Sequence, residues 1–173
     1  FKKNLNLNKF NNIILQNFAI SDVDNTTITF NESQNDWESS LIHSEFDEKK
    51  ITKIKTQKID TIIKNQKLND YSLLIKLDIE GNELQAIEGA KNTIKKYKPI
   101  IIIELSSYIF NNIDQTFDYL KSFLSEFNYS IYSTKMKLIT IEDVTLLINN
   151  LDTKHKTIGN YYLINNENIH EFK

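Results

Sequence analysis

Apolar and polar residues alternate along the chain with two distinct periods. Near-continuous apolar runs predict strands at residues 73–77 and 100–103, each buried on both faces. Between these runs, apolar residues recur at three- and four-residue steps, which predicts one helix that ends before Pro99. Asn82, with Gln85 three residues later, resembles a capping box for this helix. The apolar face of the helix carries Leu84, Ile87, Ala90, Ile94 and Tyr97.

The remaining segments continue the same order of strands and helices. Alternating or β-branched runs predict further strands at residues 13–20, 26–30, 51–56, 129–132 and 161–164. Helical spacing predicts helices that begin at residue 60, cover residues 117–127 and follow Thr140, which Asp143 helps to cap. Strands that alternate with helices are typical of an α/β fold, so we expect a mostly parallel sheet.

Composition limits the classes of function. The chain has 173 residues, enough for one domain, and a net charge of −2, which does not favour a nucleic-acid surface. Its longest apolar run, 100–103, is too short for stable insertion into a membrane. The absence of cysteine excludes disulfides and thiolate chemistry, and we expect a cytoplasmic protein. Because the sequence begins at Phe1 without a methionine, we expect it to be a piece of a longer protein.

Charged residues gather where the first buried strand meets the next helix. Lys76, Asp78 and Glu80 lie there beside Gly81, and Glu104 follows the second buried strand. Ligands of open α/β sheets bind at the carboxyl ends of strands, so we expect these side chains to share one cleft. They are therefore our candidate catalytic residues.

Each candidate also has a purely structural interpretation. Asp78 and Glu80 could complement the dipole at the helix start. Lys76 interrupts an apolar strand, and a buried lysine is costly unless it is paired, for example with Asp78, Glu80 or Glu104. Oxygen ligands from Asp78, Glu80 and Glu83 would suit a hard cation, but helix-dipole and ion-pair roles explain them as well, so we predict no metal site.

The same residues resemble a known family. Residues 76–84, 88–90 and 98–104 (the last being Lys-Pro, four isoleucines and Glu) are similar to the central signature of the FkbM-type methyltransferases. Residues 17–22 and the pair 59–60 are weaker matches in the expected order. The resemblance implies a Rossmann-like, class I methyltransferase fold and S-adenosylmethionine as cofactor.

The resemblance also implies roles for single residues. Asp78 would face the transferred methyl group and the acceptor, and Ala19 would offer a backbone N–H to the adenine edge. A carboxylate from Asp78, Glu80 or Glu104 would take the proton of an acceptor hydroxyl on a sugar, glycan, lipid or secondary metabolite. The partner would thus be a small-molecule or glycan acceptor. Oligomeric state is not predicted.

The sequence departs from the family pattern in one respect. Its three glycines, Gly81, Gly89 and Gly159, form no G-x-G, whereas the family has a cofactor-binding glycine loop after its first strand. The resemblance then implies one N-terminally incomplete domain over residues 1–173, which lacks the first strands and is the C-terminal two thirds of a catalytic domain. Two alternatives stay open: a non-catalytic remnant or accessory domain, and a different α/β enzyme whose carboxylates bind metal.

Overall fold

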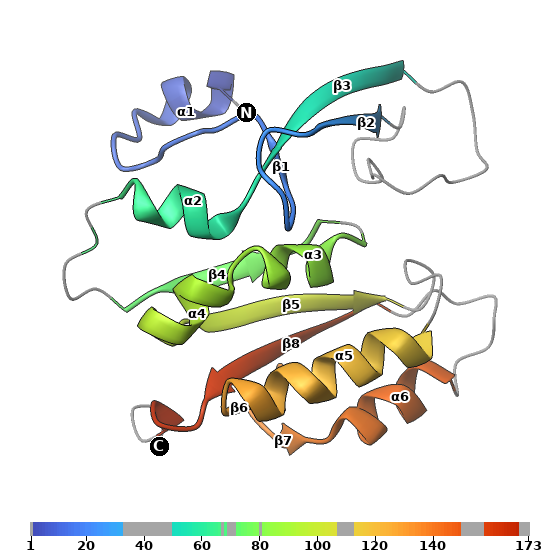
Figure 1. Ribbon diagram of the computed structural model, residues 1–173. Coiled ribbons are helices and arrows are strands. Elements are labelled where there is room, and N and C mark those ends of the chain that lie inside the picture. Colours follow the sequence, from blue (N-terminus) through green and yellow to red (C-terminus); the bar gives the residue numbers. More distant parts are fainter. Residues whose placement is uncertain are drawn as a thin grey trace.

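The computed structural model describes residues 2–32, 50–66, 68, 72–79, 81–106, 113–149 and 158–169 (Figure 1). Its helices are α1 (Lys2–Asn8), α2 (Ile59–Lys64), α3 (Glu83–Glu88), α4 (Lys91–Tyr97), α5 (Ile113–Glu126) and α6 (Ile141–Asn149). Its strands are β1 (Ala19–Ile20), β2 (Thr27–Glu32), β3 (Lys50–Gln57), β4 (Leu74–Leu77), β5 (Ile100–Ser106), β6 (Tyr129–Ser133), β7 (Leu138–Ile139) and β8 (Ile158–Asn165). The fold is therefore α/β, as predicted.

The strands form two mixed sheets. One has the order β1-β3-β2 and the other the order β4-β5-β8-β6-β7. Among the strand pairs of the described residues, β1–β3 and β4–β5 are parallel, and the other four pairs are antiparallel. The prediction of a mostly parallel sheet is wrong, because β8 returns between β5 and β6 in the opposite direction. Hydrophobic periodicity identifies a strand but does not give its neighbours or its direction.

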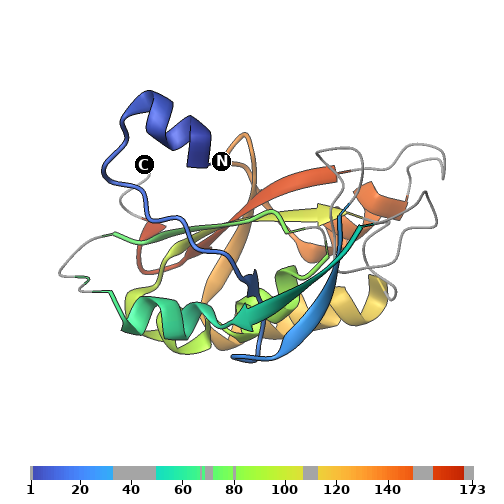
Figure 2. The same ribbon diagram turned by 90° about the horizontal axis from the view of Figure 1, so that it is seen from above.

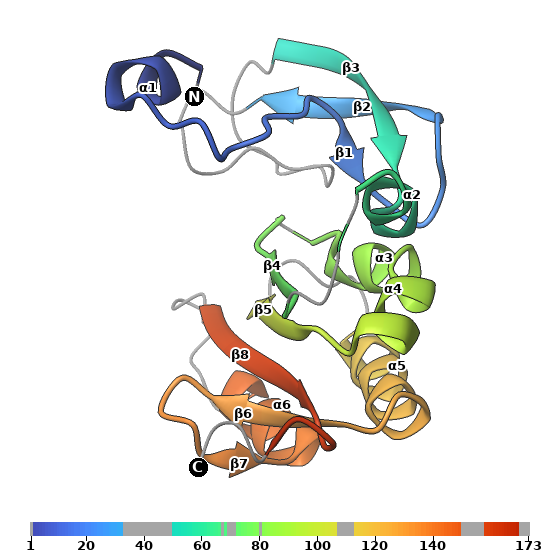
Figure 3. The same cartoon turned by 90° about the vertical axis from the view of Figure 1, so that its left-hand side faces the viewer.

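The helices α2 to α5 lie along one side of the two sheets, and α1 lies on the other side (Figures 2 and 3). The side chains of Ile101, Ile103 and Leu105 in β5 are buried in the core, which also contains Ile87 from α3 and Leu120 from α5. Each such side chain contributes roughly 1.5–3 kcal/mol through its burial. Lys76 and Asp78 lie on the alternate positions of their strand, so they face away from this helical layer.

The strand β4 lies at an edge of the larger sheet. Leu77 is buried, but Leu74 is 57% exposed, so the prediction of burial on both faces is wrong for this strand. β5 is an inner strand, and Ile101 and Ile103 are fully buried there. It continues to Ser106, so the prediction that Glu104 ends the strand is also wrong. Apolar composition alone could not distinguish the edge strand from the inner one.

The helix predicted between the two buried strands is two helices, separated at Gly89 and Ala90. A Cβ on Gly89 would lie 2.2 Å from the backbone oxygen of Ser21, which shows how closely the two backbones approach. The Gly89 carbonyl accepts a hydrogen bond of 2.9 Å from the backbone N–H of Asp60. Tertiary contacts with distant segments therefore accompany a break that the local apolar period does not show.

Several local predictions are confirmed, and others are wrong. β2 and β3 pair as antiparallel strands, and Thr140 and Asp143 exchange side chain–backbone hydrogen bonds at the start of α6. Within residues 13–20, however, only Ala19–Ile20 forms a strand, because the preceding residues have no paired neighbour in the described part of the chain. None of the helices in the described ranges is long and apolar enough to cross a membrane.

Candidate functional site

Two carboxyl groups meet where β4 and β5 run side by side. The strands are parallel, and their register pairs Leu77 with Ile103, so Asp78 and Glu104 occupy the next position on each strand. The prediction that these strands are adjacent and parallel, with both carboxylates at the same end, is confirmed. The two side chains are close enough to interact, and this contact is one cause of the lowered pKa of Asp78.

The two carboxyl groups differ in exposure. Glu104 is only 8% exposed, whereas the Asp78 side chain is 40% exposed. Asp78 is therefore the carboxyl group of this pair that a ligand can reach from solvent.

Lys76 forms an ion pair with Asp78 on the same face of β4. The Lys76 ammonium lowers the pKa of Asp78 most; partial burial acts in the opposite direction, and the hydrogen bond with Glu104 lowers the pKa further. The Lys76 side chain is 53% exposed, so the expectation of a buried lysine is wrong; the edge position of β4 explains this. Asp78 is consequently ionised at neutral pH.

A third polar residue lies beside the pair. β8 runs antiparallel to β5 and pairs Asn160 with Glu104. Residues opposite each other on neighbouring strands point to the same face, so Asp78, Glu104 and Asn160 form a polar row across three strands. Sequence analysis missed Asn160, because nothing in the local pattern showed that β8 would lie next to β5.

The loop after β4 connects this row to the smaller sheet. The side-chain amide of Asn82 donates a hydrogen bond to the backbone oxygen of Ile20, at the end of β1. Asn82 therefore does not cap α3, and the predicted capping box with Gln85 is wrong. Ala19 precedes Ile20 and pairs with Thr56 of β3. The ends of β1 and β4, which carry the predicted cofactor-binding residues Ala19 and Asp78, are thus joined through one side chain.

Glu83 fixes the same loop from inside. Its carboxylate accepts the backbone N–H of Ile79 and that of Gly81, each at 3.0 Å. Glu80 lies outside the described residues, so its predicted role has no structural account. Among the described residues, no three side chains from His, Cys, Asp or Glu are grouped as a metal site requires.

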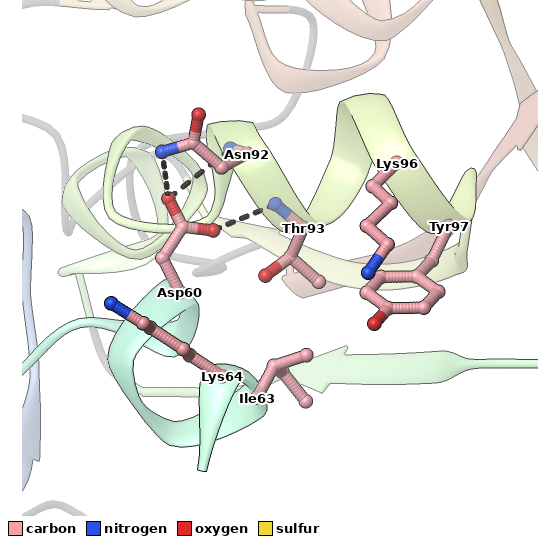
Figure 4. Close-up of a pocket in the computed structure, with 7 residues that line it drawn as sticks. All are labelled: Asp60, Ile63, Lys64, Asn92, Thr93, Lys96 and Tyr97. Atoms are coloured by element: carbon pink, nitrogen blue, oxygen red, sulfur yellow. Dashed lines mark hydrogen bonds between the residues drawn. The ribbon is translucent and has the colours of Figure 1, made fainter. Parts of the chain in front are cut away.

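Two further aspartates act at helix starts, which sequence analysis also missed. Asp24 accepts the backbone N–H of Lys58 at 2.8 Å and the hydroxyl of Thr61 at 2.7 Å. Asp60 accepts the backbone N–H groups of Asn92 and Thr93 at 3.1 and 2.7 Å (Figure 4). Both caps come from distant parts of the sequence, so no short motif reveals them.

A cavity of about 300 Å³ lies between α2 and α4, apart from the polar row (Figure 4). It is lined by Asp60, Ile63, Lys64, Asn92, Thr93, Lys96 and Tyr97. None of the predicted site residues belongs to this set. The Lys96 ammonium lies 4.6 Å from the centre of the Tyr97 ring, and the Asp60 carboxylate accepts hydrogen bonds from α4, so both of these charged groups already have partners.

Comparison with known proteins agrees with the geometry. A family model described as the methyltransferase FkbM domain matches residues 2–131, which include β1, β4, β5 and the polar row up to Glu104. Neither a curated protein nor a solved structure matches the sequence. Because the family model covers well over half of the 173 residues, the chain belongs to the FkbM methyltransferase domain family.

Proposed function

We propose that this chain is part of an S-adenosylmethionine-dependent methyltransferase of the Rossmann-like class that methylates a hydroxyl oxygen. The observation that carries the proposal is the pair of carboxyl groups of Asp78, directly after β4, and Glu104, beside it in the C-terminal half of the parallel strand β5. In α/β sheets this edge is where ligands bind. Membership of the FkbM family supports methyl transfer as the reaction class.

The described residues fit the reacting end of the cofactor. When bound, S-adenosylmethionine supplies a methyl group on a positively charged sulfur, and the sulfur keeps the bonding electron pair. Asp78 is ionised and 40% exposed, so it can face this positive charge. The family resemblance implies that the backbone at Ala19 contacts the adenine edge. The hydrogen bond from Asn82 to Ile20 supports this, because it holds the end of β1 close to the start of α3.

The same residues suit a hydroxyl acceptor. A hydroxyl donates its proton to a carboxylate, and this hydrogen bond orients its oxygen toward the methyl carbon. When such a hydroxyl attacks the methyl carbon, the carboxylate of Asp78 would take its proton. Lys76 balances the negative charge of Asp78, and the buried Glu104 lies beside it. Sugars, glycans, lipids and secondary metabolites all offer such hydroxyls.

The test uses two ligands that differ in charge at sulfur. Backbone amide spectra of the isotope-labelled chain are recorded with millimolar S-adenosylmethionine and, separately, S-adenosylhomocysteine, whose sulfur is neutral. We expect shifts at Ala19, Ile20 and residues 78–82. Asp78→Asn should lower the affinity for S-adenosylmethionine by roughly 1.5- to 5-fold more than the affinity for S-adenosylhomocysteine. This is the range for a partly exposed ion pair. Asp118→Asn, at an exposed position of α5, should leave both affinities unchanged.

Shifts confined to α2 and α4, or none at millimolar ligand, would contradict the proposal for this chain. A second candidate function is then favoured by the glycine count. The three glycines form no G-x-G, and such a loop gives dinucleotide-like cofactors their closest backbone contacts. A chain that binds neither ligand would be an accessory, non-catalytic member of the family.

A further inference from the structure

Glu83 is the most deeply buried charged residue in the described part of the chain. It is the first residue of α3, and none of its surface is exposed. A buried carboxylate is costly unless hydrogen bonds compensate for its lost hydration. An apolar side chain would fill the same space at lower cost, so its presence points to a requirement other than packing.

That requirement is visible in the loop between β4 and α3. One carboxylate oxygen of Glu83 accepts the N–H of Ile79, and the other accepts the N–H of Gly81. The backbone N–H groups of Ile79 and Gly81 are therefore both held by one carboxylate. Gly81 has a φ of 104°, a conformation that other residues rarely adopt. Together, the carboxylate and the glycine restrict the backbone at these two residues.

The hydrogen bond at Ile79 limits where the preceding residue, Asp78, can lie. On its N-terminal side, Asp78 follows Leu77, which the β4–β5 ladder holds in register with Ile103. On its C-terminal side, it precedes Ile79, whose N–H is bound by Glu83. Asp78 is consequently held from both directions, and its carboxyl group stays beside Lys76 and Glu104.

We propose that Glu83 is a positioning residue for this site: its buried carboxylate holds the backbone at Ile79 and Gly81 and thereby places the carboxyl group of Asp78 beside Lys76 and Glu104. The inference rests on the proposed function only in taking Asp78 as the reacting residue. Glu83 itself is wholly buried, so an acceptor could not reach it from solvent.

The test is Glu83→Gln in the 173-residue chain. The amide keeps the shape of the side chain and one acceptor oxygen, but its NH₂ group then faces a backbone N–H. We expect the amides of Ile79 or Gly81 to lose hydrogen-exchange protection by roughly fivefold to tenfold. We also expect the pKa of Asp78, followed by carbon-13 NMR of its carboxyl group, to rise toward its ordinary value, because Lys76 and Glu104 no longer lie beside it.

The matched control is Asp60→Asn. It also replaces a carboxylate that accepts two backbone N–H groups, but at α4. It should lower thermal stability and leave the pKa of Asp78 unchanged. An unchanged pKa of Asp78 in Glu83→Gln would overturn the proposal. An equal rise in the pKa of Asp78 in Glu83→Gln and in Asp60→Asn would also overturn it, since a general loss of stability would then explain the effect.

Two further measurements keep the proposal testable if Glu83→Gln does not fold. In the unaltered chain, the amides of Ile79 and Gly81 must be protected from exchange; open exchange at both overturns the proposal. Gly81→Ala strains the loop but keeps the carboxylate, and should raise the pKa of Asp78 in the same direction. These readouts need no cofactor. They can therefore succeed where the S-adenosylmethionine titration fails, and fail where it succeeds.

Discussion

Replacement of Asp60 by asparagine should destabilise the fold by an amount that depends on pH. The Asp60 carboxylate accepts the backbone N–H of Asn92 at 3.1 Å and that of Thr93 at 2.7 Å, and the Asn92 side-chain amide donates to it at 2.8 Å. It thus caps α4 from α2 (Figure 4). Loss of a cap costs about 0.5–2 kcal/mol, and loss of the charge at a helix start costs about 0.3–1 kcal/mol.

The expected total is about 2 kcal/mol at pH 7, which for a chain of this length lowers Tm by roughly 4–8 °C. Partial burial raises the pKa of Asp60, but hydrogen bonds from Thr93 and Asn92 outweigh it, so the net shift is downward from 3.8. A lowered pKa in the folded state means that the stabilisation is complete above about pH 4 and is lost as pH falls through the folded-state value.

The assay is thermal unfolding of the wild type and Asp60→Asn between pH 7 and pH 2.5, followed by circular dichroism. The difference in Tm should be large at pH 7 and should shrink at the acid end, where Asp60 is protonated in both states of the wild type. Asp118→Asn, which removes an exposed charge from α5, should change stability by less than about 0.5 kcal/mol. The assignment of Asp60 as a helix cap would be refuted if Asp60→Asn lowered stability as little as Asp118→Asn does. It would also be refuted if the difference in Tm between Asp60→Asn and the wild type did not vary with pH.

Three further predictions concern the site and its support. In the complete enzyme with its acceptor, Asp78→Asn should lower turnover by roughly 10²–10⁴-fold with little change in Tm. Asp22→Asn should change turnover by no more than a few-fold. Near-normal turnover for Asp78→Asn would mean that another carboxylate takes the proton. The 173-residue chain should bind S-adenosylmethionine more weakly than micromolar in calorimetry, since it has no G-x-G loop; micromolar affinity would show that the site is built differently. Gly89→Ala should destabilise the fold by about 1–3 kcal/mol in denaturant unfolding, because its Cβ would lie 2.2 Å from the Ser21 oxygen; an unchanged midpoint would mean that the β1–β2 connection moves freely.

Local sequence patterns correctly predicted much of the secondary structure. The run of isoleucines at 100–103 forms β5, and the three- and four-residue spacing at 117–127 matches α5 closely. The Thr140–Asp143 cap was readable because both partners lie within one helical turn. The sequence also predicted that Asp78 and Glu104 lie side by side, because a strand–helix–strand crossover returns the chain beside its starting strand. In each case, the interacting residues are close in sequence or joined by a connection with few alternatives.

The tertiary structure decided everything that depends on distant partners. It placed β8 between β5 and β6, which made the sheet mixed and brought Asn160 beside Glu104. It left β4 at an edge, so Lys76 is exposed rather than buried. It also brought Asp60 to the start of α4, more than 30 residues away, where its carboxylate caps the helix. A carboxylate in the sequence does not show which backbone N–H it will meet, because that choice depends on how whole elements pack, and not on the period of the residues around it.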